Sequence, residues 1–338
     1  MHAAAQTPWR FRTVGGSTGH KHLILAIGVA LLLNALTLAM IMAVTGLRLA
    51  PDLASSFVLP ILCGFAAVLC YVRDHPWRSS DALAATCVIK LGMLLCSLVT
   101  CMGLRLRLPL ADPLLASMDS YSGISIVSIN MWAASSPLIA GALQISYEAT
   151  VSVCFLVLLC NYAIGDRHRL WHVIATGSIA MQLTSFISLF LPARGSTATF
   201  NLQELQGAGL PLDAGTFALK SFDYFYFGQD KLVQLDKLNG IVCFPSFHTV
   251  LALMIVQGTS HPILRQFALA YCVLTLISTI PIGGHYIVDI LGGALVWLIS
   301  MKIGQWACRS LRSSEPITAA GADWRKYAAS FMQAKTTA

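Results

Sequence analysis

Residues 23–46 read LILAIGVALLLNALTLAMIMAVTG and contain no charged side chain. A helix needs about 20 consecutive apolar residues to cross roughly 30 Å of hydrocarbon, and this run is long enough. It is too long for the core of a signal peptide, and no small-residue cleavage site follows it, so we expect it in the mature chain. The stretch therefore predicts an integral membrane protein.

The composition of the whole chain agrees with this interpretation. Of its 338 residues, 56% are apolar and only 11% are charged, whereas soluble proteins average about 25% charged residues. This scarcity of charge excludes a cytosolic enzyme, a disordered protein and a nucleic-acid-binding protein. The ten cysteines form no CxxC pair and mostly lie inside apolar stretches, so we interpret them as small hydrophobic residues and not as a disulfide scaffold.

Seven further stretches are apolar enough to be membrane-spanning helices. They cover residues 56–72, 83–102, 147–165, 170–191, 246–259, 266–282 and 285–306. The predicted fold class is thus an all-α, polytopic helical membrane bundle with about eight transmembrane helices. The 246–259 stretch is the weakest candidate, because its 14 residues give only about 21 Å of helix.

The positions of the cations predict the orientation of the chain. With the N-terminus in the cytoplasm, 14 Lys and Arg residues lie on the cytoplasmic side and 7 on the outer side, as the positive-inside rule requires. We therefore expect a cytoplasmic N-terminal segment at 1–22 and a cytoplasmic tail at 307–338. Of the two long outer connections, 103–146 resembles short helices lying at the membrane interface, and 192–244 is suited to cap an outward-facing cavity.

The first of two stretches that carry reactive side chains is CFPSFHT at 243–249. Pro245 and Ser246 are residues that start and cap a helix, so His248 is expected in its first turn. Free backbone amides and the helix dipole favour an anion at such a helix start.

The second stretch is PIGGHYIVDILGG at 281–293. His285 and Asp289 are four residues apart and share one helix face, so the carboxylate can accept the Nδ1 proton and leave Nε2 basic. The predicted topology places His285 and His248 at the outer ends of their helices. Two histidines and two helix N-termini at the same depth suit attack on phosphorus, with one imidazole attacking and the other protonating the departing oxygen.

The pairing of Pro-Ser-x-His with His-x-x-x-Asp resembles the type 2 phosphatidic acid phosphatase superfamily. More narrowly, FPSFHT, GGHYIVD and the segment DPLLASMD at 112–119 are similar to the inositol phosphorylceramide synthase-like (inositolphosphotransferase) branch and its bacterial relatives. The resemblance implies a six-helix catalytic core, here residues 83–306, preceded by two additional transmembrane helices within 23–82. It also supports the short 246–259 helix.

The resemblance also implies a role for each matching residue. His285 is expected to be the nucleophile that becomes phosphohistidine, and Asp289 to orient it. His248 is expected to act as general acid and then as general base. Ser246 and the backbone of Phe247 are expected to contribute to the phosphate cradle. No metal and no other cofactor is expected, because histidine supplies the nucleophile.

The chain departs from the family pattern in its cations. The Ser-Arg that precedes the nucleophile in the family is Ser278-Thr279 here, and the Lys-(six residues)-Arg-Pro pattern retains only Lys231. A phosphate diester carries a single charge and needs fewer cations than a monoester, so these losses favour a diester donor. The outer-loop cations that are candidates to restore charge at the phosphate are Lys231, Lys237, Lys220 and Arg194.

We expect from these features a membrane-embedded lipid phosphotransferase that takes a phosphoryl or phosphoalcohol group from a lipid at the outer face. Its partners would be a lipid phosphate and the bilayer, at a bacterial inner (plasma) membrane, with no nucleic acid; the oligomeric state is left open. The alternatives are a lipid-phosphate phosphatase acting on phosphatidic acid or a polyprenyl diphosphate, a transporter, and an inactive scaffold. A transporter is disfavoured, because the polar groups cluster at one face.

Lys90 lies in the middle of the predicted span 83–102, where a charge costs about 2.5–3.5 kcal/mol. Two interpretations stay open. Lys90 either forms an internal ion pair, with Glu148 as the candidate partner, or extends along the helix to reach a polar region.

Overall fold

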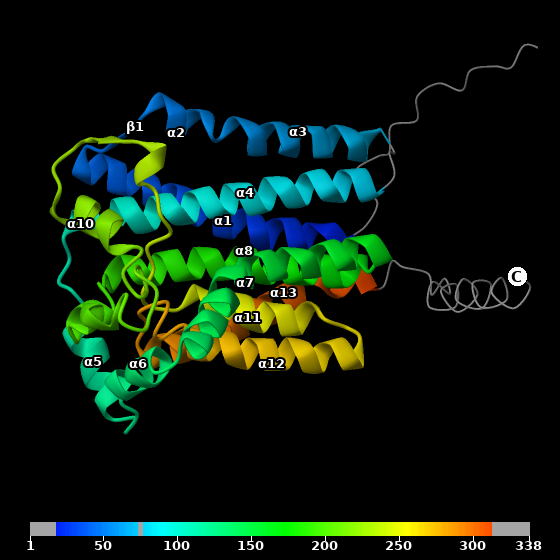
Figure 1. The fold of residues 1–338 in the computed structure, drawn as a ribbon. Helices are drawn as coiled ribbons and strands as arrows, with labels where there is room; N and C mark the ends of the chain where they lie inside the picture. Colours follow the sequence, from blue (N-terminus) through cyan, green and yellow to red (C-terminus); the bar gives the residue numbers. More distant parts are fainter. Residues whose placement is uncertain (1–17, 74–76, 313–338) are drawn as a thin grey trace, which may run out of the picture.

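The computed structural model describes residues 18–73 and 77–312, which form a bundle of helices lying side by side (Figure 1). The rest of the predicted N-terminal segment and tail, 1–17 and 313–338, lies outside the described residues. The bundle confirms the predicted fold class. Its helices are α1 (Thr18–Thr45), α3 (Val58–Val72), α4 (Trp77–Gly103), α7 (Pro137–Ile164), α8 (Arg167–Phe190), α11 (Phe247–Gly258), α12 (Pro262–Ser278) and α13 (Ile287–Arg312).

Short elements gather at one end of this bundle, and we call residues 104–136 and 191–246 there the end layer (Figure 1). Near this end, β1 (Arg48–Leu49) and β2 (Leu232–Val233) pair in parallel. α1 begins and α13 ends at the opposite end of the bundle. The remaining short elements are α2 (Pro51–Ser55), η1 (Leu104–Leu106), α5 (Asp112–Ser120), α6 (Ile126–Ala134), α9 (Ser196–Thr199), η2 (Leu202–Leu205), α10 (Leu219–Phe227) and η3 (Leu235–Lys237).

Six segments of the described chain are long and apolar enough to cross a membrane: His22–Thr45, Pro51–Val72, Arg78–Leu106, Pro137–Ile164, Arg167–Phe190 and Ile287–Cys308. α11 and α12 are apolar but shorter. Together these helices match the eight predicted stretches in number and order. The chain is thus a polytopic integral membrane protein by the length and composition of its helices.

Two predicted helix boundaries need correction. The span predicted at 147–165 begins ten residues earlier. Pro137 is the first residue of α7, and Ser136, with an extended backbone, precedes it. The segment 137–146 is therefore the start of a long helix and not a separate interfacial piece. At the other boundary, α12 ends at Ser278, and the turn 279–286 places His285 just before α13 instead of inside it.

α8 is the central helix, and 78% of its apolar window is buried inside the protein. Helices α1, α4, α7, α11 and α13 pack around it. Its middle carries small residues, which let neighbouring helices approach closely. A Cβ at Gly177 would lie 2.6 Å from the Met254 methyl carbon of α11, so this contact requires glycine or a shift of Met254.

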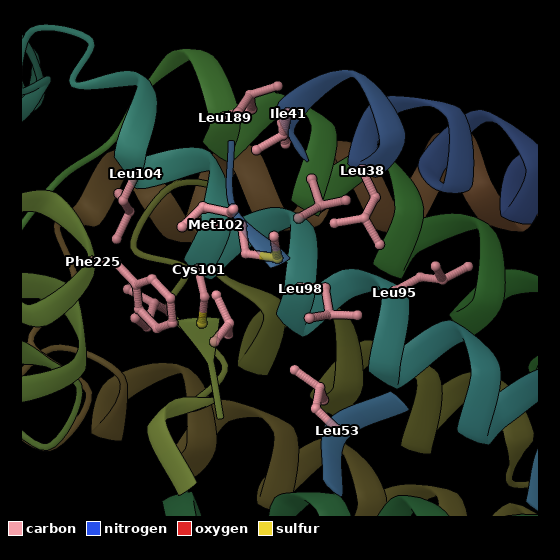
Figure 2. Packing of buried hydrophobic residues seen from close by; sticks show 14 of the residues in the cluster. Leu38, Ile41, Leu53, Leu95, Leu98, Cys101, Met102, Leu104, Leu189 and Phe225 are labelled. Carbon is pink, nitrogen blue, oxygen red and sulfur yellow. The ribbon is translucent and has the colours of Figure 1, made fainter. Parts of the chain in front are cut away.

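α1 is integrated into the bundle, and Figure 2 shows its contact region. Ile41 of α1 packs in one buried cluster with Leu98 and Met102 of α4 and with Phe225 of α10. α3, by contrast, packs mainly on α4. Of the two helices predicted to precede the catalytic core, one is therefore bound tightly to that core and one lies at its margin.

Candidate active site

The N-terminus of α11 presents two unpaired backbone amides. Ser246 caps the helix: its Oγ accepts a hydrogen bond from the Thr249 amide at 3.4 Å. The Ser246 amide itself donates to the Asp289 carbonyl at 3.0 Å. In the described part of the chain, the amides of Phe247 and His248 find no acceptor. This end of α11 is therefore open to an anion.

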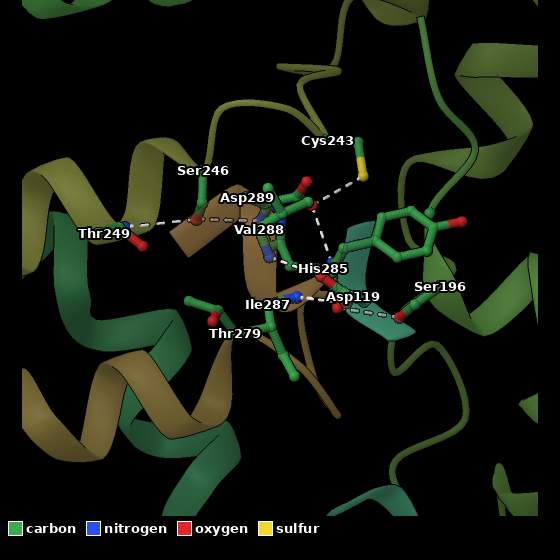
Figure 3. A network of polar contacts seen from close by, with 12 residues as sticks. Asp119, Ser196, Cys243, Ser246, Thr249, Thr279, His285, Ile287, Val288 and Asp289 are labelled. Carbon is green, nitrogen blue, oxygen red and sulfur yellow. Dashed lines mark hydrogen bonds and ion pairs between the residues drawn. The ribbon is translucent and has the colours of Figure 1, made fainter. Parts of the chain in front are cut away.

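His285 lies directly beside this helix end and is only 3% exposed. Its Nδ1 lies 3.0 Å from Asp289 Oδ2, and its Nε2 lies 3.4 Å from Ser246 Oγ (Figure 3). The carboxylate favours the proton on Nδ1, so the Nε2 lone pair faces the open end of α11. The structure thus brings together His285, Asp289 and Ser246, as the sequence predicts; their chemical roles stay a prediction.

Asp289 is the centre of a small hydrogen-bond network. Its Oδ2 accepts the Tyr286 amide at 2.9 Å and the Cys243 thiol at 3.2 Å, in addition to His285. Burial, followed by the nearby Asp289 charge, raises the pKa of Cys243 well above its ordinary range, so the thiol acts as a neutral donor. The ligand atoms of Cys243, His285 and Asp289 lie within 4.8 Å of one another, and hydrogen bonds account for their closeness without an ion.

The N-terminus of α13 is occupied by the protein itself. The Asp119 carboxylate, from α5, accepts the amides of Ile287 at 2.7 Å and Val288 at 2.8 Å (Figure 3). Asp119 is only 4% exposed. The expectation that two helix N-termini face the phosphate therefore needs correction, because a carboxylate already fills the first turn of α13.

A second carboxylate of α5 holds the neighbouring loop. Asp112 accepts the amides of Arg194 and Gly195, both at 2.9 Å, and the Tyr286 hydroxyl at 3.0 Å. Asp112 and Asp119 are seven residues apart, which places both on one face of α5. The segment DPLLASMD was predicted as a motif from its family resemblance, but the sequence indicated no role for either carboxylate.

The loop that Asp112 anchors packs against the turn that carries His285. Ser196 donates its amide to the Gly284 carbonyl at 2.8 Å and its hydroxyl to the His285 carbonyl at 3.0 Å. A Cβ at Gly283 would lie 2.5 Å from the Thr279 carbonyl oxygen, so only glycine fits there. Thr279, at the position of the family's arginine, is fully buried and supplies no charge.

Arg194 is the cation that lines the cleft with His285 and Cys243. Its Nη2 lies 3.1 Å from both carboxylate oxygens of Asp223, which orients the guanidinium. Its Nε is buried and has no hydrogen-bond partner. Among the outer-loop cations that the sequence offers as substitutes for the missing arginines, Arg194 is thus the one in this cleft.

The lysines predicted to bind phosphate lie elsewhere in the end layer. Lys231 precedes β2, and its carbonyl accepts the Arg48 amide at 2.7 Å. Lys237 forms an ion pair with Asp236 at 2.6 Å, and this hydrogen bond raises the pKa of Lys237. Neither lysine lines the cleft that contains His285.

His248 forms part of the wall of a large apolar cavity. Its ring stacks on Tyr147 of α7, with centroids 3.8 Å apart and an angle of 17° between the planes. The cavity has a volume of about 310 Å³ and lies among α4, α7, α8 and α11. α4 and α7 both pack on α8 but hardly contact each other, and both line the cavity.

Lys90 points away from the interior of the bundle. It is exposed on α4, next to the cavity-lining residue Ile89. Among the described residues it forms no ion pair with Glu148, whose carboxylate instead accepts a hydrogen bond from Gln144 at 2.8 Å. The proposed internal ion pair is therefore not formed, which leaves the extended-lysine interpretation.

The fold and the site together define a class: a polytopic helical membrane protein with two histidines and an aspartate at one end of the bundle. The chain belongs to the PAP2 superfamily, because a model of that family matches residues 113–303, more than half of the chain. The matched region contains Asp119, His248, His285 and Asp289. No curated protein and no solved structure matches the chain. Membership of the superfamily indicates phosphatase or phosphotransferase chemistry.

Proposed function

We propose that this protein is a lipid phosphotransferase that works through a phosphohistidine on His285. One observation carries the proposal: His285 Nε2 faces Ser246 Oγ at 3.4 Å, at a helix end whose Phe247 and His248 amides are unpaired. A phosphate held by these amides has its phosphorus within reach of Nε2. Such fixed donors stabilise the charge that grows on phosphoryl oxygens in the transition state.

The proposed reaction has two steps. In the first, the Nε2 lone pair of His285 attacks phosphorus, the bond to the lipid oxygen breaks, and His248 gives that oxygen a proton. Asp289 holds the Nδ1 proton and stabilises the positive imidazole. In the second, an acceptor hydroxyl attacks the phosphohistidine, His248 takes its proton, and the bond between phosphorus and Nε2 breaks.

The charge of the cleft supports a diester donor. Arg194 is the cation beside His285, and its guanidinium is shared with Asp223. Little free positive charge is therefore available, which suits a singly charged phosphodiester better than a dianionic monoester. The similarity of FPSFHT and GGHYIVD to the inositolphosphotransferase branch points the same way, so we propose transfer of a phosphoalcohol.

The apolar cavity supports a lipid as the donor. It begins at His248 and Tyr147 and continues toward the bundle interior past Met254 and Leu158. A chain in this cavity places the ester oxygen near His248. Because α4 and α7 both line this cavity and hardly contact each other, we propose that the lipid enters between them from the bilayer.

We further propose that the end layer faces the exterior of a bacterial inner membrane, with both termini in the cytoplasm. The distribution of Lys and Arg along the sequence supports this orientation. The donor would then come from the outer leaflet. Cysteine labelling from outside at an exposed end-layer position such as Leu212 tests it; labelling only after permeabilisation contradicts it.

The second candidate function is hydrolysis of a lipid phosphate. PAP2 superfamily members are generally phosphatases, and water can replace the acceptor alcohol in the second step without any change in the first. This alternative keeps the same roles for His285, His248 and Asp289. It differs only in the compound that resolves the phosphohistidine.

The experiment that tests the proposal is trapping of a labelled phosphoenzyme. Purified protein is incubated with phosphorus-labelled phosphatidylinositol or phosphatidic acid and quenched in alkali, because phosphohistidine is acid-labile. We expect label on the wild type, no label on His285→Ala, and normal label on the control His261→Ala, at an exposed position outside the site. Label on His285→Ala contradicts the nucleophile; release of free phosphate with no diester turnover contradicts the transferase.

A further inference from the structure

A second cavity lies against His248, and we call it the polar cavity because amide and carboxylate side chains line it together with apolar ones. Its volume is about 290 Å³, and it lies between residues 144–148 of α7 and residues 211–217 of the end layer. Its polar lining comes from Gln144 and Glu148 of α7 and from Asp213. The apolar cavity described above is thus one of two that open beside the same histidine.

The two cavities share one wall. Tyr147, Phe217 and His248 line both of them. The Tyr147 ring lies between the other two, stacked on His248 at 3.8 Å and edge-on to Phe217 at 6.2 Å between centroids. No hydrogen-bond partner of the His248 ring exists among the described residues. Its ring nitrogens are therefore available to groups in the cavities that it borders.

The polar cavity is negatively charged. Two carboxylates line it, those of Glu148 and Asp213, and no Lys or Arg does. Glu148 belongs to a membrane-spanning helix, where an acidic residue is expensive unless it faces a water-filled cavity. The Asp213 carboxylate accepts no hydrogen bond and forms no ion pair within the described ranges. Neither Glu148 nor Asp213 has a Lys or Arg beside it in the lining of this cavity. Two such carboxylates repel an anion inside the cavity and attract a cation there.

We propose that this polar cavity binds the acceptor alcohol, and that Glu148 and Asp213 select alcohols that are neutral or cationic and reject anionic ones. The inference rests on the proposed function, because it needs the phosphohistidine at His285. The lipid alcohol leaves toward the apolar cavity, and the acceptor alcohol enters from the polar cavity. Its hydroxyl takes the position opposite His285 Nε2 that the lipid oxygen has left. In that attack the acceptor oxygen bonds to phosphorus, the bond to His285 Nε2 breaks, and the hydroxyl proton passes to His248.

Three small alcohols of similar size and different charge test this selection. Ethanolamine, ethylene glycol and glycolate carry charges of about +1, 0 and −1 near neutral pH. The full-length protein in detergent receives a labelled phosphatidylinositol donor and equimolar ethanolamine and glycolate, or equimolar ethylene glycol and glycolate. The measured quantity is the ratio of the two labelled products, which does not depend on the amount of active protein.

We expect the wild type to favour ethanolamine over glycolate, and ethylene glycol to lie between them. In the double variant Glu148→Gln/Asp213→Asn the ethanolamine-to-glycolate ratio should fall by about tenfold, as expected for the loss of two nearby charges at high effective dielectric. The control is Asp236→Asn, which removes an exposed carboxylate of the end layer that pairs with Lys237. It should leave the ratio unchanged.

The possible failures are distinguishable. An unchanged ratio in the double variant overturns the selection by these carboxylates, as does an equal fall in Asp236→Asn. A His285-dependent phosphoenzyme that yields only free phosphate or inositol phosphate with every alcohol overturns the acceptor site but leaves the phosphohistidine in place. The absence of any phosphoenzyme overturns the proposed function and this inference with it.

Discussion

Two helix N-termini flank His285, and they are used in opposite ways. The first amides of α13 are filled by the Asp119 carboxylate. At the start of α11, Ser246 Oγ accepts the Thr249 amide. The amides of Phe247 and His248 have no acceptor within the described chain. Both ends have the same dipole and the same kind of exposed donors. What distinguishes them is whether a carboxylate of the protein already occupies the anion position.

This difference separates a structural task from a chemical one. The buried Asp119 carboxylate of α5 holds the N-terminus of α13 and, through it, positions the side chains of Asp289 and His285. An unfilled position on α11 leaves a place for the phosphate of a substrate. Substitutions at the two ends should therefore affect stability at α13 and substrate turnover at α11.

The largest effect is expected for Asp119→Asn. An asparagine offers one carbonyl oxygen where the carboxylate accepts two amides, so a partly buried donor of α13 loses its partner, at a cost of about 1–3 kcal/mol. We expect a clear fall in the thermal unfolding temperature in detergent, and loss of turnover with it. The exposed Asp236→Asn, outside the cleft and both cavities, serves as control. Wild-type stability of Asp119→Asn would show that this carboxylate does not anchor α13.

Arg194→Gln should come next, with an effect on turnover and little on folding. Removing one fixed donor to a developing oxyanion typically costs about 10²–10³-fold in rate. We expect kcat/KM for the lipid donor to fall in this range, and Lys231→Gln to stay within about threefold of wild type, because Lys231 does not line the cleft. Equal losses in the two variants would contradict the assignment of Arg194.

Phe247→Pro tests the free amides of α11 directly. Proline removes the backbone N–H at the first helical position, where the helix tolerates it, and the extended Ser246 (ψ 115°) suits a following proline. Compared with Phe247→Ala, which removes only the side chain, we expect a further fall in kcat/KM of about tenfold. The matched change at α13, Ile287→Pro, should instead destabilise the fold, because that N–H binds Asp119.

The smallest effect is expected for Cys243→Ser. The serine hydroxyl can replace the thiol as donor to Asp289 at nearly the same place, so turnover should stay within about threefold of wild type. Because the thiol pKa is raised by burial, its thiolate is scarce at neutral pH, and alkylation by a maleimide should be slow. Rapid alkylation at pH 7 with loss of activity would contradict this description.

The sequence predicts most of the fold because a membrane-spanning helix can be recognised by the length and apolar composition of its segment. Long apolar runs indicated the number and order of the helices. The beginning of α7 was missed, since Pro137, Gln144 and Glu148 interrupt the apolar pattern with residues typical of an interface. In the structure the two polar residues face a cavity, and a single sequence carries no sign of that.

The site was predictable where its contacts are local, and the contact of His285 with Ser246 across 39 residues could be expected from the predicted topology and the family resemblance. His285 and Asp289 are four residues apart, and Ser246 and His248 share one helix turn, so spacing alone suggests their arrangement. Asp119 reaches α13 across 168 residues, and Arg194 lines the same cleft as His285 from another loop. Such pairings depend on how α5 and the end layer fold over the bundle, which no local pattern describes.

α11 is only 12 residues long, about 18 Å, whereas the hydrocarbon core of a bilayer is about 30 Å thick. Its last residue, Gly258, lies near the end of α7, because its carbonyl accepts Asn161 Nδ2 at 3.0 Å. The first turn of α11 therefore lies only about 18 Å from that end of α7, less than the thickness of the hydrocarbon core. Under the proposed function, we expect a lipid phosphate to move below the headgroup plane and lose water before it reaches His285, which would make the reaction rate depend on bilayer thickness.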